Sequence, residues 1–98
     1  MIHKLIMSFE IIKPKLVKKF KFKGIVYDYL EKEYEVTGFV YVYNIENNVY
    51  ELEINGIDPD YSIEEKVKAK EITIDIIRKV LDNVCKEWKC KIMKVEEL

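Results

Sequence analysis

The sequence predicts an α+β fold: an antiparallel sheet of four to five strands, in the element order β-β-β-β-α-β, with one long C-terminal helix packed on one face. Two observations favour this fold. Of the 98 residues, 49% are hydrophobic, which is enough for one core. A chain of this length has no room for a second core, so we treat residues 1–98 as a single domain. Hydrophobic residues also follow a strand pattern in the first half and a helical period in the second.

The first half, residues 1–56, is predicted to be an antiparallel meander. Pro14 ends the first strand, because proline cannot donate a ladder hydrogen bond. Glu31 and Lys32 form a tight connection, and the segment 44–48 (NIENN) is rich in residues that tolerate turn geometry. The strands are expected at residues 3–13, 16–30, 34–44 and 49–54.

The second half is predicted to form a helix over residues 60–88, followed by a last strand over residues 90–96. Hydrophobic residues recur there at alternating steps of four and three, with Lys70 the only polar interruption. Asp60 or Ser62 can cap the start. Such a helix would be roughly 40 Å long and would cross the whole sheet. The stripe consists of Ile63, Val67, Lys70, Ile74, Ile77, Leu81, Val84 and Trp88.

A second interpretation of the same region stays open. Residues 66–70 (KVKAK) alternate as a strand does, and residues 71–74 (EITI) are rich in β-branched side chains. On this reading residues 66–72 form a strand and a shorter helix begins near Thr73. We prefer the long helix.

Period-two counting divides the central strands into two faces. If no bulge intervenes, Phe20, Phe22 and Gly24 share one face of the second strand, and Val40 and Val42 share the matching face of the third. This aliphatic face is the natural bed for the helix. The opposite face carries mainly lysines and aromatic rings, and its residues are Lys19, Lys21, Lys23, Ile25, Tyr27, Tyr29, Thr37, Phe39, Tyr41 and Tyr43.

The aromatic face needs an explanation, because one helix covers only one side of a sheet. It can dock on a second copy, it can stack on single-stranded nucleic acid, or bulges at Gly24 and Gly38 can curl the sheet and bury the rings. We favour the first, since tyrosine-rich faces are common at permanent interfaces. The expected function is a small protein-interaction module that forms a homodimer, with a further protein partner possible. The candidate interface is Tyr27, Tyr29, Phe39, Tyr41 and Tyr43.

Nucleic-acid binding is the alternative function. Lys19, Lys21 and Lys23 could neutralise phosphates while bases stack on the nearby tyrosines. The first 24 residues hold seven lysines and one glutamate, but residues 25–65 hold eleven acids and one lysine, and the net charge is −1. This balance favours the dimer over a polyanion binder.

No catalytic, cofactor or metal site is expected. His3 is the only histidine, no G-x-S-x-G or clustered-glycine motif occurs, and the spacing of Cys85 and Cys90 fits neither a redox motif nor a zinc knuckle. Both cysteines are therefore interpreted as buried thiols.

The setting expected from composition is the cytoplasm of a thermophile. Lysine and glutamate are abundant and glutamine is absent, which is typical of thermophilic and archaeal proteins. Neither a membrane span nor a signal peptide is expected, because the sequence lacks a long uncharged hydrophobic run.

Overall fold

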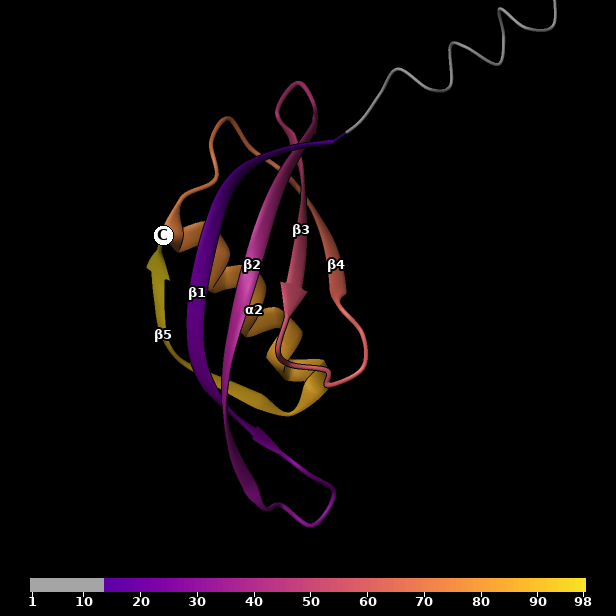
Figure 1. The fold of residues 1–98 in the computed structure, drawn as a ribbon, viewed down its shortest axis with the longest axis vertical. Coiled ribbons are helices and arrows are strands. Elements are labelled where there is room, and N and C mark those ends of the chain that lie inside the picture. Colours follow the sequence, from indigo (N-terminus) through magenta and orange to yellow (C-terminus); the bar gives the residue numbers. More distant parts are fainter. Residues whose placement is uncertain (1–13) are drawn as a thin grey trace, which may run out of the picture.

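The computed structural model describes residues 14–98, so the strand predicted at residues 3–13, and His3 within it, lie outside the described residues. The described part forms a five-stranded antiparallel sheet in the order β4-β3-β2-β1-β5, with one helix on one face (Figure 1). The α+β class is therefore confirmed. The elements are β1 (Lys15–Tyr27), β2 (Glu33–Glu46), β3 (Val49–Asn55), β4 (Ile63–Lys68), α2 (Ile74–Trp88) and β5 (Cys90–Glu97).

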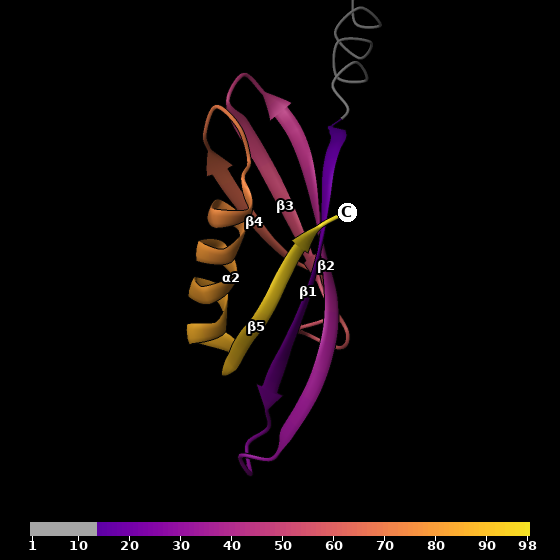
Figure 2. The same cartoon turned by 90° about the vertical axis from the view of Figure 1, so that its left-hand side faces the viewer.

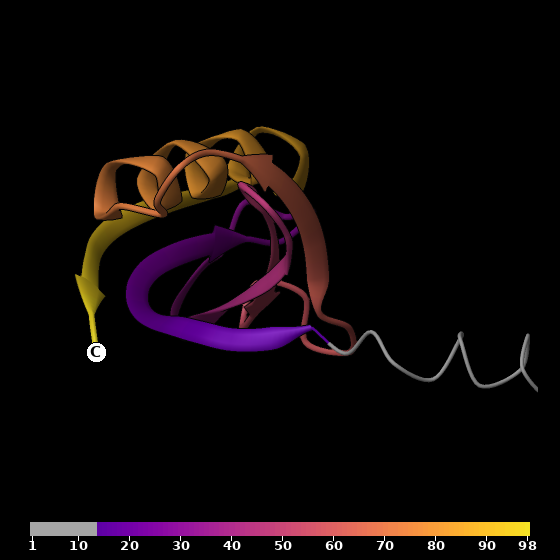
Figure 3. The ribbon, with the colours of Figure 1, turned by 90° about the horizontal axis from the view of Figure 1, so that it is seen from above.

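The core lies between the sheet and α2, on the face that the sequence predicted. Phe20 and Phe22 from β1 and Val40 and Val42 from β2 are almost completely buried against the helix residues. The sheet curves around α2, so that the face turned away from the helix is convex (Figures 2 and 3). We call this convex side the outer face. The helix contributes Ile77, Leu81, Val84 and Cys85 to the core, and β3 contributes Leu52 and Ile54.

The prediction of one helix over residues 60–88 was wrong in its first half. Residues Ile63–Lys68 form β4, the edge strand that pairs with β3, and the helix begins only at Ile74. Ile63 and Val67 are four positions apart, and this spacing fits both a helical stripe and one face of a strand. Pairing with β3 decides between the two, and the alternative of a strand followed by a short helix describes the region better.

Local capping fixes both ends of α2. The Thr73 side chain accepts a hydrogen bond from the Ile76 amide at 3.4 Å, which satisfies one of the free donors of the first turn. At the other end Lys89 adopts a left-handed conformation with φ of 50°, and its amide donates to the Cys85 carbonyl. The chain therefore turns sharply and returns to the sheet as β5.

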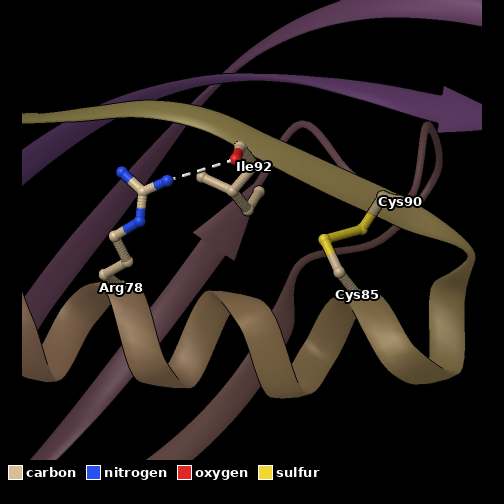
Figure 4. Close-up of a disulfide and its surroundings, with 4 residues drawn as sticks. All are labelled: Arg78, Cys85, Cys90 and Ile92. Atoms are coloured by element: carbon tan, nitrogen blue, oxygen red, sulfur yellow. Dashed lines mark hydrogen bonds between the residues drawn. A yellow bond between two sulfur atoms is a disulfide. The ribbon is translucent and has the colours of Figure 1, made fainter.

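That turn brings Cys85 and Cys90 together, and the prediction of two buried thiols is corrected: they form a disulfide with Cα atoms 4.5 Å apart (Figure 4). The bond ties the end of α2 to the start of β5. One arginine joins the same two elements, since Arg78 Nη2 donates to the Ile92 carbonyl at 3.4 Å.

Reducing the disulfide is expected to lower the free energy of unfolding by about 2 kcal/mol, because the bond closes a loop of only about six residues in the unfolded chain. For a domain of this size, that corresponds to a fall of roughly 10 °C in Tm. Thermal unfolding followed by circular dichroism, with and without a thiol reductant, measures the shift. The Cys85→Ser/Cys90→Ser variant is the control: it should unfold at the lower temperature in both buffers, and a reductant effect in that variant would contradict the assignment.

A candidate self-association surface on the outer face of the sheet

Three parallel strips of side chains cover the middle of the outer face. In an antiparallel pair, residues directly opposite each other share a face. Register places Lys19 opposite Tyr41 and Lys21 opposite Phe39, so a basic strip on β1 lies beside an aromatic strip on β2. The basic strip is Lys19, Lys21 and Lys23; the aromatic strip is Phe39, Tyr41 and Tyr43.

The basic and aromatic strips contact each other. Lys19 Nζ lies 4.8 Å from the centre of the Phe39 ring and 5.2 Å from that of Tyr41. The two ring centres are 6.4 Å apart and the planes are tilted by 37°. Exposed contacts of an ammonium with a ring stabilise by about 0.5–1 kcal/mol each. They hold the rings in place but leave them partly exposed, so curvature of the sheet does not bury the aromatic strip.

An acidic strip borders the aromatic strip on its other side. Tyr41 lies opposite Glu53 and Tyr43 opposite Glu51 on β3, and Glu53 in turn lies opposite Glu64 on β4. The acidic strip is therefore Glu51 and Glu53, whereas β4 carries both signs on this face, with Lys66 opposite Glu51 and Glu64 opposite Glu53. Across the three central strands, the outer face is therefore basic on β1, aromatic on β2 and acidic on β3.

Tyr43 is coupled to the acidic strip. Its hydroxyl donates to Glu53 Oε2 at 3.3 Å. The pKa of the phenol lies above its usual value, first because burial disfavours the phenolate and second because the Glu53 carboxylate repels the negative charge and accepts the hydrogen bond. The phenol is therefore neutral and available as a donor at pH 7. A hollow of about 240 Å³ beside it is lined by Pro14, Tyr43, Glu51 and Glu53.

The structure adds Leu16 to this surface, a residue that period-two counting missed. An irregularity between Leu16 and Lys18 inserts one extra residue, and Leu16 then pairs with Tyr43. Without the bulge Leu16 would share the buried face with Phe20 and Phe22. It is 50% exposed instead, and it extends the apolar area at the end of the aromatic strip.

The five predicted interface residues do not form one patch. Phe39, Tyr41 and Tyr43 lie together, whereas Tyr27 is the last residue of β1 and lines a separate hollow with Glu31 and Lys89. Tyr29 lies in the turn between β1 and β2, where it is 88% exposed. Counting in steps of two placed Tyr29 with the others because the counting was continued beyond Tyr27, where the strand ends.

The turn that carries Tyr29 is tightly organised around Asp28. Its Oδ1 atom accepts from the amides of Leu30 at 2.8 Å and Lys32 at 2.9 Å, and Oδ2 accepts from the Tyr34 hydroxyl at 3.3 Å. The hairpin projects beyond the other strands (Figure 1), since β3 pairs with β2 only as far as Phe39. We call residues 28–34 the hairpin tip.

The outward side of α2 and the edge strand β4 are less suited to association. The outward residues of α2 are mainly charged or amide side chains, and the edge strand β4 has the sequence IEEKVK, whose charges discourage pairing with another edge. A hollow of about 460 Å³ lies where β1 begins. There Lys18 Nζ donates to the Ile72 carbonyl at 2.8 Å and pairs with Glu71, so this lysine holds β1 to the loop before α2.

Comparisons with known proteins give no independent lead. The chain matches no protein-family model, no curated protein and no solved structure. Among residues 14–98, no helix is both long enough and apolar enough to cross a membrane, and no group of three or more His, Cys, Asp or Glu residues is arranged to hold a metal ion.

Proposed function

We propose that the protein is a small, non-catalytic, cytoplasmic interaction module that self-associates through the outer face of its sheet. The observation that carries the proposal is the aromatic strip, Phe39, Tyr41 and Tyr43, which lies on the central strand of the sheet with no second layer over it in the described part of the chain. Sheets bury an apolar face by packing it on another layer, and a second copy supplies one.

Charge supports a second copy as the occupant. An aromatic strip between a basic strip and an acidic strip is complementary to itself, because the same surface offers both signs of charge. A uniformly basic or acidic partner would meet one favourable strip and one repulsive strip.

The convex shape limits the strength of the association. Only the central strands can approach a second copy closely, so the interface belongs to the small class below about 1,200 Å². We therefore expect a dissociation constant on the order of 100 µM.

Nuclear magnetic resonance of the ¹⁵N-labelled protein tests which face associates. Amide spectra recorded across a dilution series from about 1 mM to 10 µM span the expected dissociation constant. Shift changes should concentrate in the segments around Lys19, Tyr41 and Glu53, while α2 serves as the internal control. Concentration-dependent shifts confined to α2, or none at all, would overturn the proposal.

Nucleic-acid binding remains the second candidate because Lys19 contacts two aromatic rings and lies in line with Lys21 and Lys23. Binding of this kind should weaken steeply with salt, since each neutralised phosphate releases counterions. Fluorescence anisotropy of a labelled single-stranded oligonucleotide at 50 and 200 mM salt measures it.

For this second candidate, Lys21→Glu should reduce the affinity for every oligonucleotide sequence, and the matched control Lys79→Glu on α2 should reduce it less. No binding by the unmodified protein, or binding independent of salt, rules the candidate out.

A further inference from the structure

We propose that the two copies are related by a twofold axis parallel to β2, so that β1 of each copy lies over β3 of the other. This inference rests on the proposed self-association and specifies its geometry. It follows from the order of the three strips and from the register of the strands that carry them.

One row of residues defines the arrangement. Lys19, Tyr41 and Glu53 lie side by side across β1, β2 and β3, because Lys19 pairs with Tyr41 and Tyr41 pairs with Glu53. A twofold axis along β2 in the plane of contact exchanges the two sides of the row. Lys19 then lies over Glu53 of the second copy, Glu53 over Lys19 of the second copy, and the two Tyr41 rings meet near the axis.

The other face-to-face twofold axis runs across the strands, and charge disfavours it. That axis places β1 over β1, so the basic strip of Lys19, Lys21 and Lys23 would face its own copy. Like charges brought together across an interface are strongly unfavourable, and here the repulsion would recur at the acidic strip. The order basic, aromatic, acidic therefore selects the axis parallel to β2.

This geometry places both hairpin tips at the same end of the dimer. An axis parallel to the strands leaves each strand's direction unchanged, whereas an axis across the strands reverses it. The tip is a suitable reporter because the contacts of Asp28 fix its backbone and Tyr29 extends into solvent. The distance between the two tips thus distinguishes the two orientations.

Charge reversal tests the pairing of β1 with β3. Lys19→Glu alone, or Glu53→Lys alone, places like charges at two symmetric contacts, and each should raise the dimer dissociation constant at least about tenfold. The double variant Lys19→Glu/Glu53→Lys restores opposite charges and should return to within about threefold of the unmodified protein. Lys23→Glu is the matched control, since it makes the same charge change opposite Thr37 and should have a smaller effect.

A distance measurement between spin labels attached at Tyr29→Cys gives a second readout. One short distance, with both labels at the same end, is expected. Labels at opposite ends, or no rescue in the double charge variant, would overturn the orientation while leaving self-association intact. If the labelled protein and the unmodified chain both remain monomeric at every concentration, the orientation and the proposed function are overturned together.

Discussion

Gly38→Ala is expected to lower the free energy of unfolding by about 3 kcal/mol, at the upper end of the usual cost of overpacking a core. A Cβ atom at this position would come within 2.5 Å of the Phe22 ring and of the Asn55 carbonyl oxygen. The ring can rotate only into other core side chains, and the carbonyl belongs to the backbone of β3. The strands must therefore separate, and Tm should fall by roughly 10–20 °C.

Two further variants show whether close approach is the cause. Thr37→Ala, at the neighbouring exposed position of β2, should change stability by less than about 0.5 kcal/mol. Adding Phe22→Leu to Gly38→Ala should not restore stability, because the contact with the Asn55 carbonyl remains. Denaturant unfolding measures all three, and a Gly38→Ala protein as stable as the unmodified one would contradict the close packing of β2 against Phe22 and Asn55.

Tyr41→Asp is expected to raise the dimer dissociation constant at least about a hundredfold. The substitution removes a ring from the centre of the aromatic strip, and it does so in both copies. It also places a carboxylate beside the acidic strip, opposite Glu53. Because the Tyr41 side chain lies on the outer face, the monomer should keep its fold and lose only the contacts of the ring with Lys19 and Phe39. Sedimentation equilibrium measures the dissociation constant.

Tyr61→Asp provides the matched control for that experiment. Tyr61 is 75% exposed in the loop before β4 and belongs to none of the three strips, so the same chemical change should leave the dissociation constant within about twofold. Equal effects of the two substitutions would show that added charge, and not loss of the central ring, weakens association. Circular dichroism of each variant verifies that the monomer is folded.

Strands β1, β2 and β3 and the buried face were predictable because their signals are local. Alternation around Phe20 and Phe22, and again around Val40 and Val42, placed both pairs on the face of the sheet that the helix covers. The start of α2 was not predictable by the same means. Ile63 and Val67 satisfy a strand and a helix equally, and only the pairing of β4 with β3 removes the ambiguity.

The candidate surface was predicted in part. The residues that were not predicted depend on a bulge in β1 or on the register of β3. The bulge beside Val17 moves Leu16 to the outer face, and no spacing rule reveals where an extra residue is inserted. The acidic strip depends on the register of β3, which a hairpin turn sets and which alternation alone does not give. The disulfide likewise depends on the helix ending at Trp88, since only the left-handed turn at Lys89 brings Cys90 back to Cys85.

Self-association through the outer face is tested most directly by the molar mass in solution. Size-exclusion chromatography with light scattering, at loading concentrations from about 10 µM to 1 mM, covers the expected dissociation constant. The mass should rise with concentration from 11.8 kDa towards twice that value, and less so at high salt because the charged strips are screened. A mass of 11.8 kDa at every concentration would contradict the account.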